Sequence, residues 1–243
     1  MKILHVTPFY EPFWAYGGMA RGSAGLCRAL VRRGHEVRVA TALLEAGAPL
    51  EESVGGVAVR RFSGPALLRR WLIPWARGLR GFLRRELERF DVVHLHGHRN
   101  GLAVTTARAL AESGRSWVLQ PSGTYPHHGQ YGTVKTLFDR VAGDRIVLGA
   151  SRLVAVSGCE ARDLPRPAQV VPNGVEPCGA APVPAKTGPA RAGPVVLFVG
   201  TDRPQKRGHL LPRLLEALPS ASTPRGVTRF PKGAKRPRKG APT

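Results

Sequence analysis

The stretch KILHVTPFYEPFWAYGGMARGSAGLCRALVRRGHEVRVAT (Lys2–Thr41) decides the fold class. A short apolar run at Ile3–Thr7 predicts a buried strand, the amphipathic stretch Met19–Arg33 predicts a helix, and Glu36–Thr41 predicts a second strand. Gly34 stands just after the helix, where glycine tolerates the left-handed conformation of a helix end. A strand, a helix and a strand in this order predict a β-α-β unit with parallel strands.

The same alternation continues as far as residue 177 and predicts the rest of the domain. Short apolar runs alternate with longer helical patterns, which is typical of an α/β fold with a doubly wound, Rossmann-like parallel sheet of about seven strands. The further strands are expected at Val57–Phe62, Val92–Leu95, Trp117–Gln120, Leu153–Ser157 and Gln169–Pro172. The further helices are expected at Leu67–Phe90, Leu102–Ser113 and Val134–Gly149, with a short helical turn near Cys159–Asp163.

The composition changes sharply after residue 177 and predicts a domain boundary. Residues 178–194 are rich in Pro, Ala and Gly without periodicity, which predicts a linker. Residues 195–219 read as a strand, a glycine turn and an amphipathic helix, the start of a second Rossmann-like unit. Residues 220–243 are basic with few apolar side chains, a composition typical of a disordered tail. We therefore expect one complete domain over residues 1–177 and a truncated second domain.

The formal net charge of +21 is unevenly distributed along the chain. The last nineteen residues, Arg225–Thr243, hold seven Lys and Arg and no acid, and nine arginines lie between Arg60 and Arg89. No RNA- or DNA-binding motif is present, and aromatic residues do not interleave with the basic ones on a strand face. We interpret the charge as a solvated basic surface and expect no specific nucleic-acid partner.

Cysteine usage and hydropathy indicate a cytoplasmic protein. Cys27, Cys159 and Cys178 form no C-x-x-C pair, which argues against a disulfide framework and a zinc site. The N-terminal apolar run is too short for a signal peptide, and no stretch approaches the roughly 18 apolar residues of a membrane span. The basic, Trp-containing segment Leu67–Trp75 leaves two alternatives open, a helix that covers the sheet or a peripheral contact with the anionic inner face of a membrane.

The first βα loop ends in Gly17 and Gly18, directly before the first expected helix. Ligands of doubly wound sheets lie at the carboxyl ends of the strands, so this loop faces the expected cleft. Two glycines there let the backbone approach a ligand and direct free N–H groups at an anion. A simple tight turn explains them equally well, and the spacing is not the G-x-G-x-x-G of a dinucleotide site.

The stretch DVVHLHGHRNG (Asp91–Gly101) places His94, His96 and His98 at alternate positions, which on a strand share one face. This pattern suggests a metal site, but no Asp, Glu or Cys stands nearby as a further ligand, so we expect none. His96 stands at the carboxyl end of the strand and is the better candidate for a substrate contact in the cleft.

Two later segments carry further candidates. In QPSGTYPHHGQ (Gln120–Gln130), Gly123 permits close backbone approach, with polar neighbours at Ser122, Thr124, Tyr125, His127 and His128; an ordinary polar turn is an equal alternative. In FVGTDRPQKRGHLL (Phe198–Leu211), a strand and a glycine turn bring cations to the start of a helix, an arrangement suited to a phosphate.

Together these segments resemble the family 4 glycosyltransferases of the GT-B fold, and the resemblance covers about residues 1–219. The motifs that carry it are KILHVTPFYEP followed by GG, LVRRGHEVRVAT, DVVHLHGHRNG, WVLQPSGTYP, SRLVAVSGCE, VPNGVE and LFVGTDRPQKRGHLL. Their order along the chain is more specific than any single motif. The resemblance implies two Rossmann-like domains, with the acceptor in the N-terminal one and a nucleotide-sugar in the C-terminal one.

The resemblance also implies roles for individual residues. Gly17 and Gly18 match the glycine-rich acceptor-side loop that reaches the donor phosphate, while His96 and Gly123 fall on loops that line the cleft between the domains. Lys206 matches the lysine that clamps the donor diphosphate. Thr201 stands where an arginine is common, so Arg203 or Arg207 has to supply that charge. No residue is assigned as catalytic.

The implied activity is the transfer of a sugar from a nucleotide-sugar to an acceptor hydroxyl with retention at the anomeric carbon. The nucleotide-sugar is a co-substrate, the acceptor is a sugar or a lipid-linked sugar, and no metal or other cofactor is expected, since the sequence contains no D-x-D pair. The acidic E-x7-E element that grips the donor is absent. We therefore expect this chain to be truncated and inactive by itself; the alternative is a non-catalytic module that binds an acceptor or a membrane surface.

Overall fold

The computed structural model describes residues 1–14, 17–44, 47–65, 75–126, 132–175, 208–211 and 213. Contacts divide the chain into two units, Met1–Cys178 and Gly179–Thr243. In the second unit the description is confined to a 3-10 turn, η5 (Gly208–Leu210), and the residues next to it.

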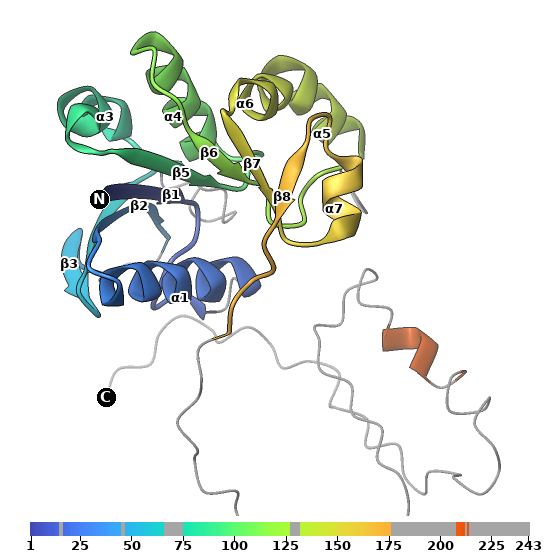
Figure 1. Ribbon diagram of the computed structural model, residues 1–243, viewed down its shortest axis with the longest axis horizontal. Helices are drawn as coiled ribbons and strands as arrows, with labels where there is room; N and C mark the ends of the chain where they lie inside the picture. The colour runs from blue at the N-terminus through green and yellow to red at the C-terminus, as the bar shows by residue number, and fades with distance from the viewer. Residues whose placement is uncertain are drawn as a thin grey trace, which may run out of the picture. The chain divides into compact units, whose positions relative to one another are not determined.

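The first unit is built on one eight-stranded sheet, shown in Figure 1. The strands are β1 (Lys2–Thr7), β2 (Glu36–Leu43), β3 (Glu51–Val54), β4 (Val57–Ser63), β5 (Val92–His96), β6 (Val118–Gln120), β7 (Arg152–Ala155) and β8 (Ala168–Val170). Their order across the sheet is β3-β4-β2-β1-β5-β6-β7-β8, and every neighbouring pair is parallel except β3 with β4. The predicted doubly wound α/β class is confirmed.

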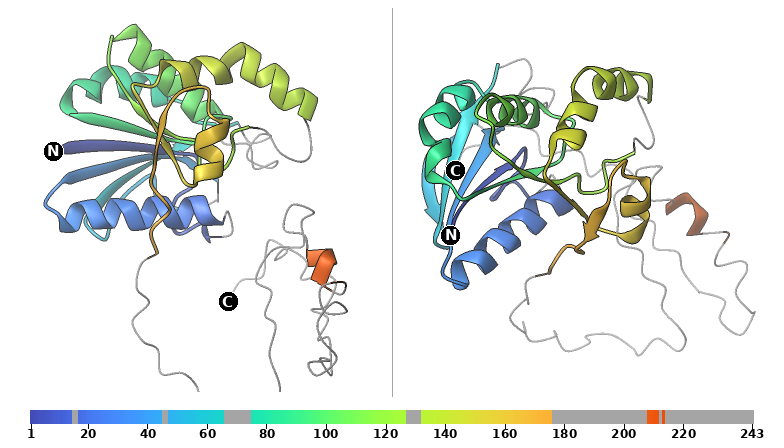
Figure 2. Two further views of the ribbon diagram at one scale, coloured as in Figure 1. Left: turned by 45° about the vertical axis from the view of Figure 1, so that its right-hand side comes forward. Right: turned by 45° about the horizontal axis from the view of Figure 1, so that its top comes forward.

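Helices cover both faces of this sheet. They are α1 (Gly18–Arg32), α3 (Leu79–Glu86) with the 3-10 turn η2 (Leu87–Arg89), α4 (Gly101–Glu112), α5 (Gly132–Phe138), the π-helical turn η3 (Asp139–Gly143), α6 (Asp144–Gly149) and α7 (Gly158–Asp163). Helix α1 lies on one face, and α3, α4 and α6 lie on the other (Figures 1 and 2). The expected helix Val134–Gly149 is confirmed as α5, η3 and α6, which follow one another without a gap.

The core has one part on each face of the sheet. Leu4 of β1 is fully buried in the cluster that includes Leu83 of α3 and Leu102 of α4. Val39 of β2 is fully buried in the cluster that includes Cys27 of α1. Because successive strand residues point to opposite faces, one short apolar run serves both clusters, as expected for a sheet covered on both sides.

Strand β3 is absent from the sequence prediction. It pairs antiparallel with β4 through a turn at Gly55 and Gly56, which have φ angles of 58° and 79°. Two adjacent glycines between extended segments favour a tight hairpin, because both central positions of such a turn require positive φ. The sheet therefore has an antiparallel edge strand, and the expectation of a wholly parallel sheet was wrong at that edge.

The expected helix Leu67–Phe90 is only partly correct. The described helix begins at Leu79, because Gly78 before it has a left-handed conformation with a φ angle of 81°. Leu79, Phe82 and Leu83 are buried, so the prediction that the part after Leu79 covers the sheet is confirmed. The stretch proposed to lie on a membrane falls outside the described residues, except for its last residue, Trp75.

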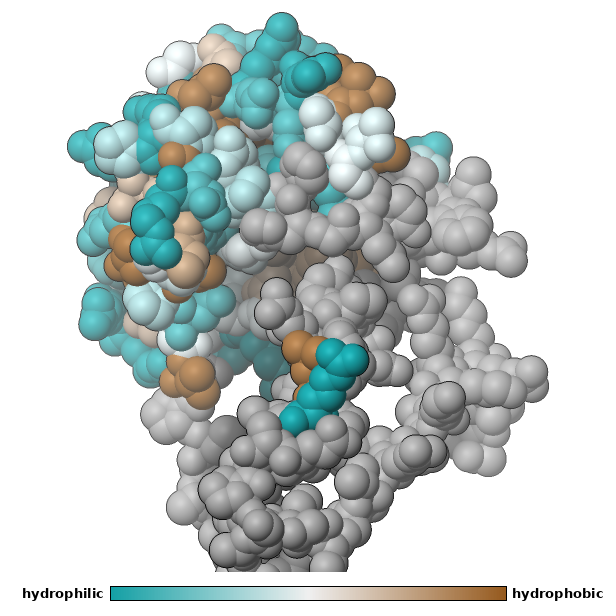
Figure 3. Space-filling model, turned by 90° about the vertical axis from the view of Figure 1, so that its right-hand side faces the viewer, coloured by the Kyte–Doolittle hydropathy of each residue, from teal (hydrophilic) through white to brown (hydrophobic). Residues whose placement is uncertain are grey.

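On the face shown in Figure 3, the coloured residues are mostly hydrophilic, with apolar side chains in separate small patches. Among the described helices, none has both the length and the apolar character needed to cross a membrane.

Arg61 of β4 departs from the prediction of a solvated basic surface, because its side chain is fully buried. Its Nη2 donates to the backbone oxygen of Glu11 at 2.7 Å, and its Nη1 donates to that of Pro49 at 3.0 Å. It also forms an ion pair with Glu52. Arg61 thus joins β4, to which it belongs, with Glu52 of β3 and with the loop after β1, which contains Glu11.

Replacing this buried cation should destabilise the domain strongly. We expect Arg61→Met to lower the free energy of unfolding by about 3 kcal/mol, because buried acceptors and a carboxylate lose their partner. Urea unfolding of the purified protein measures this change. Arg60→Met is the matched control, since Arg60 is partly exposed and pairs with the exposed Glu51, and such a pair contributes about 1 kcal/mol or less. Equal losses in the two variants would contradict this account.

Candidate functional site

The carboxyl ends of β5 and β6 meet one side of α1 and the segment after β8 around a small cavity. Its volume is about 60 Å³, which leaves room for a few water molecules. The lining residues are Met19, Gly22, Ser23 and Leu26 of α1, His96 and Gln120 at the ends of β5 and β6, Ser122, and Val171, Pro172, Asn173 and Gly174. This edge is where doubly wound sheets bind ligands.

Gln120 and Asn173 connect two walls of the cavity, and the sequence analysis did not single out either of them. Nε2 of Gln120 donates to Oδ1 of Asn173 at 3.2 Å. A Cβ atom added at Gly22 would lie 3.4 Å from the same Oδ1, so α1 passes close to Asn173. The motif VPNGVE could have pointed to Asn173, because it places a polar side chain next to a glycine directly after the last expected strand.

Gly17 and Gly18 lie at the N-terminus of α1, directly before Met19, the first residue of the helix that lines the cavity. Gly17 has a φ angle of 80° and a ψ angle of −147°, and no side chain caps the helix there. This conformation is essentially restricted to glycine, which explains the residue type. The structure brings the two glycines to the edge predicted for them, and their role toward a phosphate stays a prediction.

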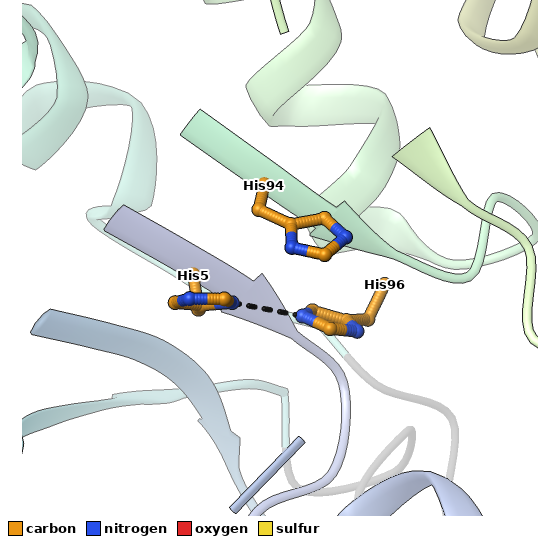
Figure 4. Close-up of side chains that lie close together, drawn as sticks. All are labelled: His5, His94 and His96. Carbon is orange, nitrogen blue, oxygen red and sulfur yellow. Dashed lines mark hydrogen bonds between the residues drawn. The ribbon is translucent and has the colours of Figure 1, made fainter. Parts of the chain in front are cut away.

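His96 joins a buried group of three histidines with His94 and, unexpectedly, His5 of β1 (Figure 4). Nδ1 of His5 and Nε2 of His96 share a hydrogen bond of 3.0 Å, and the rings of His94 and His96 stack with centroids 4.3 Å apart. His5 is 1% exposed and His96 is 3% exposed. Burial lowers the pKa of all three, to about 4 for His94, so the imidazoles are neutral at pH 7.

His98 does not share this face, although its spacing predicted that it would. Gly97 has a φ angle of 70°, and the strand ends there. His98 belongs to the loop after β5 and is fully buried against the loop after β6. Its Nδ1 lies 3.2 Å from Oγ1 of Thr124, and its Nε2 lies 3.6 Å from Oδ1 of Asp139. The prediction that one strand face presents all three alternate histidines was therefore wrong for His98.

Arg99 holds the same two loops together. Its Nε and Nη2 donate to the two carboxylate oxygens of Asp139 at 2.8 and 2.6 Å, and it also donates to the backbone oxygen of Thr124. A bidentate guanidinium–carboxylate pair fixes both distance and orientation. The loop after β5, the loop after β6 and the turn η3 are thus joined beside the site.

Gly123 is held by the buried carboxylate of Glu160, which belongs to α7. Oε1 of Glu160 accepts from the backbone N–H of Gly123 at 2.6 Å, and Oε2 accepts from that of Val156 at 2.9 Å. Gly123 has a φ angle of 76°, so its conformation favours glycine. Gly123 does not line the cavity itself, whereas the neighbouring Ser122 does. Its predicted role in the cleft stays a prediction, and Glu160 is a positioning residue that the sequence analysis missed.

Replacing Glu160 with glutamine should loosen this loop. The amide has one oxygen in place of two, so one of the two N–H groups would face an NH2 group. We expect the free energy of unfolding to fall by about 1–3 kcal/mol and the amide proton of Gly123 to exchange faster with solvent. Hydrogen exchange followed by NMR measures the second effect. Asp163→Asn, an exposed change on the same helix, is the control and should leave Gly123 unchanged; protection of Gly123 that survives Glu160→Gln would contradict this role.

A second cavity, of about 290 Å³, lies between α4, Trp117 and the segment η3–α6. It is larger, but Trp117 precedes β6, and Arg108, Ala111 and Glu112 belong to the last turn of α4. These positions are at the amino ends of the strands, the edge opposite to the one where doubly wound sheets bind ligands. We therefore place the candidate site at the smaller cavity.

The predicted donor-phosphate residues Arg203, Lys206 and Arg207 lie outside the described residues, as do His127 and His128. Their assignment stays a prediction. Three further expectations also stay predictions, because almost all of their residues lie outside the described part: the linker 178–194, the strand in 195–219 and the tail 220–243.

Solved structures similar to this chain include Anabaena HepE in complex with UDP, with 19% identity, a TM-score of 0.47, and coverage of 72% of this chain and 45% of that one. Sucrose-phosphate synthase from Thermosynechococcus elongatus has 12% identity, a TM-score of 0.46, and coverage of 70% and 47%. The catalytic domain of starch synthase IV from Arabidopsis thaliana, bound to ADP and acarbose, has 15% identity, a TM-score of 0.42, and coverage of 67% and 46%. The chain thus spans less than half the length of each.

The match to a family model shows the family to which the chain belongs. No curated protein matches the chain. Residues 17–179 match the family model described as a glycosyl transferase 4-like domain, and this range includes α1, the cavity and every described candidate residue except His5. The resemblance found in the sequence motifs is confirmed, and the chain belongs to the glycosyl transferase 4-like domain family.

Proposed function

We propose that this domain is the acceptor-binding side of a glycosyltransferase that moves a sugar from a nucleotide-sugar to an acceptor hydroxyl with retention at the anomeric carbon. The observation that carries the proposal is the cavity at the ends of β5 and β6, lined by His96, Gln120 and Asn173. It lies at the ligand-binding edge of the sheet and inside the family match.

The chemistry of the cavity suits an acceptor better than a phosphate. None of its lining side chains carries a formal charge at pH 7, since burial keeps the pKa of His96 well below its usual value. The amides of Gln120 and Asn173 and the hydroxyls of Ser23 and Ser122 can each donate and accept hydrogen bonds. Hydroxyl groups at one edge of a sugar offer the same two functions, whereas a diphosphate requires cations or free backbone N–H groups.

The donor side of the proposal rests on the family. Developing charge on the leaving diphosphate would be stabilised by Arg203, Lys206 or Arg207 together with the backbone N–H groups at Gly17 and Gly18, because fixed cations and amides favour charge that appears in the transition state. The proposal needs no metal for this step. The acceptor is a sugar or a lipid-linked sugar, and a peripheral contact with an anionic membrane fits the second kind.

We also propose that this chain by itself binds an acceptor without turning over a donor. After Val195 the sequence contains only two acidic residues, Asp202 and Glu216, and they do not form the E-x7-E element expected to grip the donor sugar and ribose. Transfer depends on holding donor and acceptor in one geometry, which supplies up to about 7–11 kcal/mol of the barrier reduction.

Calorimetry on the full 243-residue chain tests this function. A panel of mono- and disaccharides is expected to include a weak binder, whose affinity falls at least about tenfold in Gln120→Leu, the size of one lost buried hydrogen bond. Gln169→Leu, on the exposed strand β8, is the matched control and should bind as the parent does. Release of nucleoside diphosphate from UDP-, GDP- and ADP-sugars should be absent. If Gln120→Leu binds the sugar as tightly as the parent does, the cavity is not part of the acceptor site. Turnover of a donor would show that the chain is active alone.

A further inference from the structure

The three histidines on β1 and β5 form a group that the proposed sugar transfer does not use. We propose that His5, His94 and His96 bind a divalent transition-metal ion of the kind that prefers imidazole nitrogen, such as Zn²⁺ (Figure 4). This inference is independent of the proposed function, since no step of the transfer passes through the ion.

The geometry places the three ligands close to the spacing that a metal needs. One ligand nitrogen from each histidine lies within 4.8 Å of the other two, and those of His5 and His96 are 3.0 Å apart. Nitrogens bound tetrahedrally at about 2.0–2.1 Å from zinc are about 3.4 Å apart. Rotation of the side chains would bring the three nitrogens to this spacing, since the His5–His96 pair lies slightly inside it and all three lie within 4.8 Å.

The sheet itself supports this arrangement. His5 and His94 are register partners on the neighbouring parallel strands β1 and β5, and His96 follows on the same face of β5. These are two central strands, with neighbours on both sides. A ligand set held by rigid backbone is preorganised, so binding requires only adjustment of side-chain torsions.

The electronic state of the rings is also suited to a metal. Burial disfavours the charged imidazolium, so each of the three neutral rings has one unprotonated nitrogen. Nε2 of His94 is buried and has no hydrogen-bond partner within the described residues, and a bound ion would take the place of the proton that Nδ1 of His5 and Nε2 of His96 share. Buried polar atoms without a partner are uncommon and call for an explanation such as an ion or a water.

The ligand types narrow the class of ion. The group contains three imidazoles and, among the described residues, neither a carboxylate nor a thiolate. Imidazole suits Zn²⁺, Cu²⁺, Ni²⁺ and Co²⁺, whereas Mg²⁺ and Ca²⁺ prefer oxygen. Three protein ligands leave a fourth position for water, and His96 also lines the cavity, which gives solvent a route to the site. The sequence analysis expected no metal because no Asp, Glu or Cys stands near the histidines of β5; it did not consider His5, which lies on another strand.

The test uses the full chain after removal of metal by a chelator. Because His127 and His128 are adjacent in the sequence and could bind metal themselves, the parent protein carries His127→Gln and His128→Gln. Calorimetry with Zn²⁺ alone is expected to show one bound ion, and Co²⁺ is expected to give the visible absorption of a tetrahedral nitrogen site. At a hundredfold excess over Kd, Zn²⁺ should raise the Tm by roughly 5–10 °C.

Variants assign the site to its residues. His5→Gln and His94→Gln should each weaken Zn²⁺ binding at least about a hundredfold, since even the loss of an outer partner of a ligand costs 10- to 100-fold. His98→Gln, at another buried histidine, should bind Zn²⁺ as the parent does. If His5→Gln does not fold by circular dichroism, His94→Gln carries the test, because His94 is only partly buried. A folded parent that binds no Zn²⁺, or equal affinity in the parent and His94→Gln, would overturn the proposal.

Discussion

Lowering the pH from 7 to 5 in metal-free buffer is expected to reduce the free energy of unfolding of this domain by about 4 kcal/mol. The cause is burial of histidines in their neutral form. In the folded protein, burial lowers the pKa of His94 and of His98 to about 4, whereas the ordinary value is 6.5. For His98 the neighbouring Arg99 lowers the pKa further, and Asp139 opposes the shift.

The direction of the effect follows from where the protons bind. Between pH 6.5 and pH 4 the unfolded chain binds a proton at each of these histidines and the folded domain does not, so falling pH favours unfolding. The contribution is fully present above pH 6.5 and declines as the pH falls toward 4. With these values each histidine accounts for about 2 kcal/mol at pH 5, a large share of a typical stability of about 5–15 kcal/mol. His5 and His96, whose pKa values are also lowered, act in the same direction.

Urea unfolding at pH 5, 6 and 7 in the presence of a chelator measures this dependence. In His98→Gln one titrating group is removed, so the loss between pH 7 and pH 5 should shrink by about 2 kcal/mol. His35→Gln is the matched control, because His35 lies at the surface near the N-terminus and should leave the dependence unchanged. Stability that stays constant between pH 7 and pH 5 would mean that these histidines are charged, or exposed to water, in the folded protein.

Local patterns in the sequence were sufficient for the fold class. The apolar runs of β1, β2 and β5 are short and nearly continuous, which is what burial on both faces of a parallel sheet produces, and the pattern of α1 has helical periodicity. Strand β3 was missed although Gly55 and Gly56 marked its turn, because its alternating residues are mostly polar and only one of its faces contacts the protein.

The site was less predictable because its contacts join distant parts of the chain. His5 contacts His96, which is 91 positions further along the chain, and it also contacts the nearby His94. Glu160 binds Gly123, which is 37 positions before it. Such contacts depend on strand order and register, which spacing along one strand does not contain. Spacing was misleading for His98, because a single glycine with positive φ, Gly97, turned the chain before it. Arg61 was taken for a surface residue because composition does not reveal which arginine finds buried acceptors.

The second large effect is expected from Gly17→Val in an enzyme that joins residues 1–177 to the complete nucleotide-sugar domain of another family member. We expect the kcat/KM for sugar transfer to fall at least about a hundredfold, which corresponds to about 2.7 kcal/mol of transition-state stabilisation. Gly17 has a φ angle of 80° and a ψ angle of −147°, a region in which valine is strained. The strain can only be relieved by turning the peptide groups at the start of α1, and these carry the N–H groups proposed to face the donor phosphate.

The space around Gly17 makes this variant informative. Among the residues that the structure describes, a Cβ atom there would meet nothing within 4 Å, so we expect the domain still to fold. The first residues of α1 that anchor the core, Ala20 and Ala24, lie further along the helix. Gly17→Val is therefore expected to change the backbone direction at the start of α1 and to lower the free energy of unfolding by about 1–3 kcal/mol.

Gly34→Val separates the loss of transfer from that loss of stability. Gly34 follows the other end of α1, has a φ angle of 82° and also has open space for a Cβ atom. Both variants place valine at a position with positive φ, at opposite ends of one helix, and only Gly17 lies at the edge where β5 and β6 end. We expect Gly34→Val to lower the Tm while transferring sugar at the parent rate. Equal loss of transfer in both would attribute the effect to stability, and a folded Gly17→Val enzyme with parent activity would remove the first βα loop from the site.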